Sequence, residues 1–230
     1  LAGETIEDVL KRSMRMNAVK AVPMFMSVCQ ALAHAHKAGI VHRDLKPGNI
    51  MLLKDDTGNQ VVKLVDFGIA KPICDQDSDL TAAGSVIGTP SYMSPEQCLG
   101  KPLDTRSDIY SLGCVMYHVL TGVRPLTGQN SLETLTKQVS EQPRSFSEVA
   151  GGVQLPDTLE RSVFRALMKA PGDRHQSVVE LREELEQAIA KLFDDSALRQ
   201  SMGMKARRLV ERKFSWDQGA KEMSFVYEDI

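Results

Sequence analysis

His-Arg-Asp-Leu-Lys-Pro-Gly-Asn occupies residues 42 to 49, and Asp-Phe-Gly follows at residues 66 to 68. Two apolar runs lie between them, residues 50 to 53 and 61 to 65, separated by Asp-Asp-Thr-Gly-Asn at residues 55 to 59. Apolar runs on both sides of such a turn predict a β-hairpin. The first motif opens this hairpin and the second closes it, so the two motifs should lie side by side.

Most of the remaining sequence has helical periodicity. Residues 4 to 11 predict a short helix, and apolar residues from Val22 to His36 recur at three- and four-residue steps, with Pro23 near the first turn and Gly39 at the end. Further helices are expected at residues 105 to 120, 131 to 139, 156 to 168 and from 177 onward. Ile40 and Val41 form a short apolar run that suits a strand.

Residues 66 to 96 show no persistent periodicity. A loop of about thirty residues is usually either functional or disordered. The sequence therefore predicts a small hairpin and one long loop within a mostly helical chain.

Composition narrows the class of protein. The 230 residues carry a net charge of -2, which gives no sign of a nucleic-acid or anionic-membrane partner. No apolar run approaches the roughly 20 residues of a membrane-spanning helix. The four cysteines do not have the spacing of zinc ligands, and they indicate reduced thiols in a cytoplasmic protein. They are Cys29, Cys74, Cys98 and Cys114.

Two more runs complete a family pattern. Residues 88 to 97 read Gly-Thr-Pro-Ser-Tyr-Met-Ser-Pro-Glu-Gln, and residues 107 to 113 read Ser-Asp-Ile-Tyr-Ser-Leu-Gly. Together with the first two motifs, they resemble the eukaryotic-type serine/threonine protein kinases of bacteria, over roughly residues 1 to 186. The resemblance implies a mostly α fold: a kinase large lobe with a small hairpin at residues 1 to 190, followed by a two-helix tail at residues 191 to 230.

The resemblance also implies a reaction, the transfer of a phosphoryl group from ATP to Ser or Thr hydroxyls of protein substrates. In it, Asp44 would be the catalytic base, and Lys46 would place a positive charge on the transferred group. Asn49 and Asp66 would bind Mg²⁺, and Met51 would form part of the floor under the adenine ring.

Lys46 also bears on specificity, because Asp-Leu-Lys-Pro is typical of serine/threonine kinases within the family. Thr89 agrees, since its hydroxyl is expected to bond near Asp44 and Lys46. At position 48 this sequence has Gly where the family pattern more commonly has Glu. Because that Glu does not transfer protons, the departure puts the strength of peptide binding in doubt and not the activity.

Four further residues match structural positions of the family. Glu96 and Arg174 would form an ion pair between the activation segment and the helical subdomain; alternatively they are unrelated surface charges. Asp108 would anchor the catalytic-loop backbone near His42 and Arg43. His42 itself is expected to be a buried, hydrogen-bonded histidine.

Regulation is expected in the long loop. In the family, an Arg at the position of Arg43 commonly receives a phosphate from the activation loop, and Thr81 and Ser85 are the candidate acceptors. Three aspartates between residues 75 and 79 would repel the added charge and favour its movement toward Arg43. The alternative is an unregulated loop.

The family's glycine-rich loop, strand lysine and helix glutamate do not occur in this sequence. Since the first residue is Leu1, we expect a fragment that starts just after the hinge between two lobes and has little activity alone. A non-catalytic interaction module is the alternative from another functional class. The sequence does not indicate whether the kinase is dimeric.

Residues 193 to 230 are similar to the C-terminal end of GT-B-fold glycosyltransferases. The matching residues are Phe214-Ser215-Trp216 and Tyr227, and Ser215 with Gln218 is expected to form a capping box. This segment would be structural, in a chimera with a glycosyltransferase end; the alternative is a helical pair of the kinase's own linker.

Overall fold

The structure is a computed structural model that describes residues 3–55, 58–68, 90–149 and 155–194, with side chains in the last helix to residue 190. The chain divides into two compact units, Leu1–Gln187 and Ala188–Ile230.

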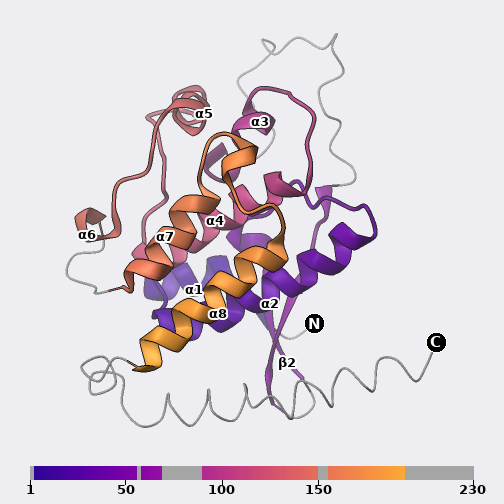
Figure 1. The fold of residues 1–230 in the computed structure, drawn as a ribbon, viewed down its shortest axis with the longest axis vertical. Helices are drawn as coiled ribbons and strands as arrows, with labels where there is room; N and C mark the ends of the chain where they lie inside the picture. Colours follow the sequence, from indigo (N-terminus) through magenta and orange to yellow (C-terminus); the bar gives the residue numbers. More distant parts are fainter. Residues whose placement is uncertain (1–2, 56–57, 69–89, 150–154, 195–230) are drawn as a thin grey trace. The chain divides into compact units, whose positions relative to one another are not determined.

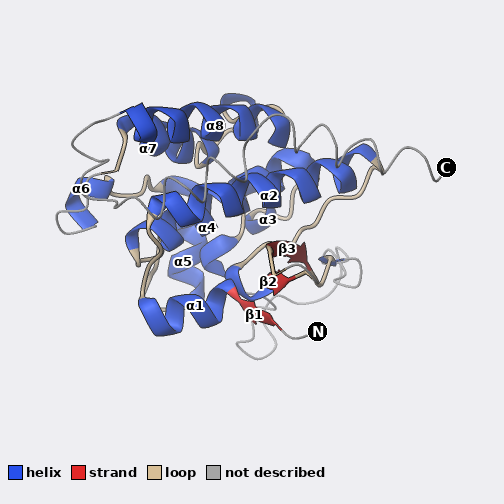
Figure 2. Ribbon diagram, turned by 90° about the horizontal axis from the view of Figure 1, so that it is seen from below, coloured by secondary structure: helices blue, strands red, loops and turns tan. Residues whose placement is uncertain are grey.

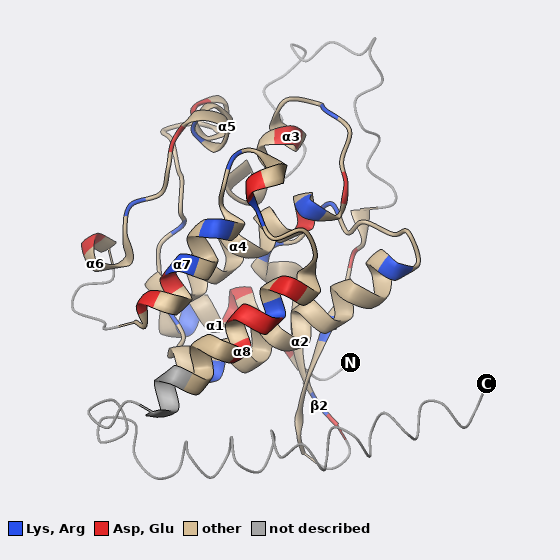
Figure 3. Cartoon of the chain, in the orientation of Figure 1, with Lys and Arg blue, Asp and Glu red and all other residues tan. Residues whose placement is uncertain are grey.

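The described residues are mostly helical, with one small sheet (Figure 1), and their charged residues are spread over many of the helices (Figure 3). The helices are α1 (Ile6–Ser13), α2 (Ala18–Lys37), α3 (Pro95–Cys98), α4 (Thr105–Thr121), α5 (Ser131–Ser140), α6 (Phe146–Val149), α7 (Asp157–Ala166) and α8 (Val178–Asp194). Single 3₁₀ turns lie at Pro47–Asn49, Pro90–Tyr92 and Pro171–Asp173. The mostly α class predicted from the sequence is confirmed.

An antiparallel sheet of three strands, in the order β1-β2-β3, lies at the edge of the helices (Figure 2). Its strands are β1 (Gly3–Thr5), β2 (Ile50–Lys54) and β3 (Gln60–Leu64). Ile50 pairs with Leu64, and the Val65 amide donates to the Asn49 carbonyl at 3.0 Å. The predicted hairpin is therefore present, and its pairing brings the ends of the two motifs together.

Helix α4 is the centre of the core (Figure 1). Its side chains are buried around the whole circumference, which marks a helix enclosed by others. A Cβ on Gly113 would lie 3.0 Å from the Ala166 Cβ of α7, so a glycine lets these two helices approach closely. Asp104 caps the start of α4, and Gly122 ends it with φ of 84°.

The start of the chain differs from prediction. The helix expected from residue 4 begins at Ile6, because Thr5 caps it in a capping box with Asp8. Gly3, Glu4 and Thr5 pair instead with β2 as a third strand. Three residues are too few to show strand periodicity, which is why the sequence did not reveal β1.

Two other predictions near the first motif were wrong. Ile40 and Val41 do not form a strand, because the Ile40 amide bonds to the Ala35 carbonyl as the chain leaves α2. Pro23 lies beyond the first turn of α2, since Asn17 caps that helix further upstream. Gly39 follows the end of α2 with φ of 74°, as predicted.

Candidate active site

The loop at residues 42 to 49, called the catalytic loop after the family resemblance, is held from below by α4. Asp108, 1% exposed, accepts hydrogen bonds from the backbone amides of His42 at 2.8 Å and Arg43 at 3.0 Å. The His36 ring of α2 also contacts Asp108, with 2.7 Å between Nε2 and Oδ2. One buried carboxylate thus fixes the backbone immediately before Asp44, and His36 is a partner that the sequence did not indicate.

His42 is fully buried and its ring lies against Phe67, with 4.5 Å between the ring centroids. Its Nε2 lies 3.1 Å from the Val65 carbonyl. Burial lowers the pKa of His42, although Asp108 acts in the opposite direction. A neutral ring that bonds to the backbone suits a structural role in the loop.

Asp44, Lys46 and Asn49 form a compact polar group in the loop. The Lys46 Nζ donates to the Asp44 Oδ2 at 2.9 Å. The Asn49 Nδ2 donates to the Asp44 carbonyl at 2.8 Å and to its Oδ2 at 3.3 Å. The carboxylate is part-exposed and held from two sides, whereas Asn49 is 4% exposed.

Asp66 comes directly after Val65, whose amide donates to the Asn49 carbonyl across the hairpin. Asp66 and Asn49 therefore lie at the same end of the sheet. Asp66 is exposed and adopts φ of 54°, a left-handed conformation uncommon for a residue other than glycine. Gly68 is needed for space: a Cβ there would lie 3.1 Å from the His42 carbonyl, to which its amide donates at 2.8 Å. Arg43 also has a positive φ, 65°, so strained backbone flanks the polar group on both sides.

Asp66 and Asn49 provide oxygen atoms of the kind that divalent cations prefer. No group of three His, Cys, Asp or Glu side chains in the described part of the chain is placed to hold a metal. Magnesium, however, is usually bound by one or two carboxylates with substrate phosphates and water. Asp66 with the amide oxygen of Asn49, whose nitrogen is engaged by Asp44, fits that pattern.

Met51 and Gly48 lie on either side of the start of β2. Met51 is part-exposed and pairs with Thr5 of β1. A Cβ on Gly48 would lie 3.0 Å from the Glu7 Oε2 of α1. The carboxylate of Glu7 therefore lies beside the position at which the family pattern commonly has Glu, a juxtaposition that the sequence could not show.

Glu96 and Arg174 are brought together by the structure. Arg174 is fully buried, and its two terminal nitrogens each donate to one oxygen of Glu96 at 2.8 Å. Ser107 donates to the same carboxylate at 2.7 Å. The other N–H groups of the guanidinium donate to the carbonyls of Met168, Arg106 and Lys169.

Two neighbours of this pair were not found from the sequence. The guanidinium carbon of Arg174 lies 4.9 Å from the centre of the buried Tyr110 ring, a cation–π arrangement. Gln97 of α3 donates through Nε2 to the Arg43 carbonyl at 2.6 Å. Helix α3 is thus bonded to the catalytic loop as well as to Arg174.

Several predicted residues lie outside the described part of the chain. They are the candidate acceptors Thr81 and Ser85, as well as Thr89 and Cys74. Cys29, Cys98 and Cys114 are free thiols. None of the described helices is long and apolar enough to cross a membrane.

Comparison with known families gives one consistent result. The protein kinase domain model matches residues 1–204. The chain is 41% identical over 183 residues to the serine/threonine-protein kinase PknB of Mycobacterium tuberculosis, covering 80% of this chain and 28% of PknB. It is 40% identical over 194 residues to the serine/threonine-protein kinase pkn3 of Myxococcus xanthus, covering 83% of this chain and 35% of pkn3. The chain therefore spans about a third or less of these relatives.

Solved structures agree with the sequence comparisons. The crystal structure of the M. tuberculosis PknI kinase domain superposes with a TM-score of 0.58 at 26% identity, over 81% of this chain and 62% of that one. The kinase model also reaches into residues 193 to 204, the start of the segment for which a glycosyltransferase resemblance was expected. That resemblance falls almost wholly outside the described residues. On its sequence and its fold, the chain belongs to the protein kinase family.

Proposed function

We propose that this lobe belongs to an enzyme that transfers a phosphoryl group from ATP to serine or threonine hydroxyls of protein substrates. The observation that carries the proposal is the polar group of the catalytic loop, in which Lys46 and Asn49 both donate to the carboxylate of Asp44. Its similarity to named serine/threonine kinases supports the same reaction.

Asp44 is the catalytic base in this proposal. Its carboxylate accepts the proton of the substrate hydroxyl and orients that oxygen for in-line attack. Lys46, 2.9 Å from the Asp44 carboxylate, supplies positive charge where the transferred group passes. Positioning and charge account for most of the catalysis in phosphoryl transfer, so a fixed loop is what this site needs.

Asn49 and Asp66 would hold magnesium, and Met51 would contribute to the adenine floor. When bound, magnesium would offset the negative charge of the ATP phosphates. The hairpin register keeps the two ligand residues at one end of the sheet.

Replacement of Asp66 by alanine tests the magnesium assignment. The variant is made in this chain joined to an upstream lobe that carries the glycine-rich loop and strand lysine. Because a metal ligand is lost, we expect the magnesium concentration for half-maximal rate to rise about tenfold or more. Titration of magnesium at fixed ATP measures this, with the exposed Asp157→Ala as the matched control. An unchanged magnesium dependence in Asp66→Ala contradicts the assignment.

The 230 residues alone are proposed to have little activity, because the glycine-rich loop and strand lysine are not in their sequence. A non-catalytic interaction module is the second candidate function. Equal phosphorylation rates for the joined protein and its Asp44→Asn variant would favour that candidate.

A chimera with a glycosyltransferase end remains a hypothesis for the tail alone. A cytoplasmic location is proposed on the free thiols of Cys29, Cys98 and Cys114.

Phosphorylation of Thr81 or Ser85 is proposed to activate the enzyme. Arg43 is exposed, and its backbone is held by Asp108 and Gln97, so its side chain starts from a fixed point of the catalytic loop and its guanidinium is accessible to a phosphate. A phosphate carries about -1.5 to -2 charge and pairs well with a guanidinium.

We expect mass spectrometry of the joined protein to find phosphate on Thr81 or Ser85 after incubation with ATP. The double variant Thr81→Ala with Ser85→Ala should then be at least about tenfold less active, because its switch segment can no longer take up the activating phosphate. Full activity in that variant, or phosphate on neither residue, would refute the switch.

A further inference from the structure

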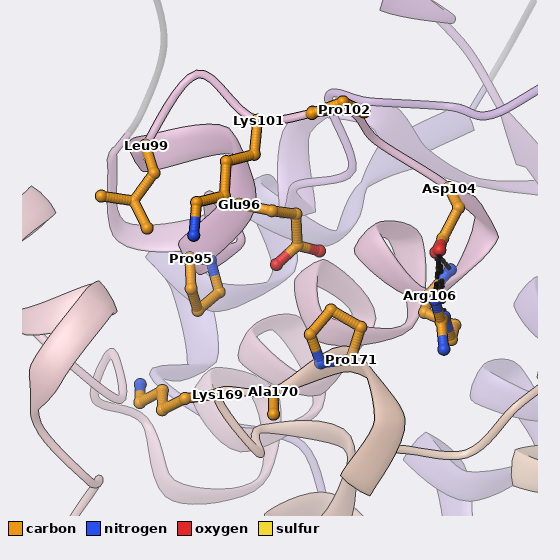
Figure 4. A pocket seen from close by; sticks show the side chains of 10 residues that line it. All are labelled: Pro95, Glu96, Leu99, Lys101, Pro102, Asp104, Arg106, Lys169, Ala170 and Pro171. Carbon is orange, nitrogen blue, oxygen red and sulfur yellow. Dashed lines mark hydrogen bonds and ion pairs between the residues drawn. The ribbon is translucent and has the colours of Figure 1, made fainter.

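A pocket of about 470 Å³ lies beside α3, and none of the residues proposed for catalysis lines it. Helix α3 and residues 99 to 106 form one side of it, and residues 169 to 171 form the other (Figure 4). Much of its wall is apolar: Leu99, which is 50% exposed, with Pro95, Pro102 and Pro171. Proline-rich walls of this kind are rigid, so a ligand would meet a preformed surface.

Both acidic residues of the pocket are already neutralised. Glu96 is bonded through both oxygens to Arg174. Asp104 accepts hydrogen bonds from the Arg106 guanidinium at 2.6 to 3.2 Å. Neither carboxylate therefore presents an unbalanced negative charge to a ligand.

The two lysines are not neutralised in this way. Lys101 and Lys169 extend from opposite walls of the pocket (Figure 4). Within the described ranges, neither ammonium forms an ion pair with a carboxylate, and Lys169 donates only to the Tyr110 hydroxyl, at 2.9 Å. The Lys169 Nζ also lies 5.2 Å from the centre of the Tyr110 ring, and burial lowers the pKa of this lysine to about 8. The pocket thus has an excess of positive charge over an apolar wall.

We propose that this pocket is a docking site for an acidic segment of a partner protein. An Asp or Glu of the segment pairs with Lys101 and Lys169, and an aliphatic neighbour packs on Leu99 and the prolines. Charge complementarity selects the carboxylate, and the apolar wall selects a peptide over a nucleic acid, which needs a row of cations along its phosphates. The site is separate from phosphoryl transfer, so it stands whether or not the proposed reaction is correct.

Fluorescence polarisation of the 230-residue chain with a labelled peptide that alternates leucine and aspartate tests this site. We expect saturable binding that weakens as salt rises, and no comparable binding of a peptide with lysine in place of aspartate. Lys101→Glu should weaken binding about tenfold, and Leu99→Ser about threefold, because they remove the charge and the apolar contact respectively. Both residues are exposed, so both variants should keep the unfolding midpoint of the parent. Lys20→Glu, at an exposed lysine of α2, is the matched control and should bind as the parent does.

Three results would overturn the proposal. They are the absence of saturable binding at millimolar peptide, equal affinity of the Lys101→Glu and parent chains, and displacement of the peptide by an equally charged single-stranded oligonucleotide. The assay needs neither ATP nor an upstream lobe, so its failure is distinguishable from failure of the proposed reaction.

Discussion

Asp44→Asn is expected to lower the rate of phosphoryl transfer by about a hundredfold or more, the range that loss of a general base usually costs. Asparagine keeps the size of the side chain and can still accept a hydrogen bond from Lys46, which lies 2.9 Å from the carboxylate. It cannot take up the hydroxyl proton. The rate at saturating ATP and peptide, in the chain joined to an upstream lobe, measures the effect.

The loss should fall on kcat, with KM for ATP nearly unchanged, because Asp44 is not assigned to nucleotide binding. The matched control is Asp173→Asn, at an exposed turn residue, which should have parental kinetics. Near-normal turnover in Asp44→Asn would remove this residue from its role.

Arg174→Ala is expected to destabilise the chain by about 3–5 kcal/mol, since removal of one partner leaves the other charge buried and unpaired. The substitution leaves the carboxylate of Glu96, a residue that is 7% exposed, without its ion-pair partner. It also removes the hydrogen bonds that three backbone carbonyls accept from the guanidinium. It also removes the guanidinium from the face of Tyr110. Urea denaturation, followed by circular dichroism, measures the change in the free energy of unfolding.

Arg182→Ala is the matched control, because Arg182 pairs with Glu186 on the surface of α8, where both side chains are about 40% exposed. Such a pair contributes only about 0.5 kcal/mol. Equal losses of stability in the two variants would contradict the account of the buried pair.

The contribution of Glu96 should also depend on pH. Burial raises the pKa of its carboxyl, but the hydrogen bonds from Arg174 and Ser107 outweigh burial and hold the pKa below its ordinary value of 4.5. A lowered pKa stabilises the folded state above the unfolded pKa, and this stabilisation is lost as pH falls through the folded pKa. The difference in stability between the parent and Glu96→Gln should therefore be constant above about pH 5 and shrink in more acidic solution. A difference that grows on acidification would contradict this assignment.

The sequence allowed a prediction for those site residues that lie within a motif or at a fixed distance from one. Asp44, Asn49 and Asp66 lie in two short motifs joined by a hairpin, and the apolar runs of that hairpin already implied that its ends meet. Glu96 and Arg174 were paired in advance because each lies at a family position, although 78 residues separate them.

Contacts without a motif were missed. His36 bonds to Asp108 from a different helix, and Gln97 reaches the Arg43 carbonyl through a single amide. In the sequence, neither His36 nor Gln97 stands out from the other polar residues of a helix. The three residues of β1 were missed for a related reason, because pairing with β2 rather than local propensity makes them a strand.

The central claim, that this lobe serves a protein serine/threonine kinase, is tested most directly by transfer of radiolabel from γ-labelled ATP to a protein substrate. The chain joined to an upstream lobe is incubated with magnesium, labelled ATP and myelin basic protein, and the phosphoamino acids are then separated. We expect label on serine or threonine, and we expect it to disappear in Asp44→Asn. No transfer from a folded, ATP-binding protein, or label on tyrosine alone, would contradict the claim.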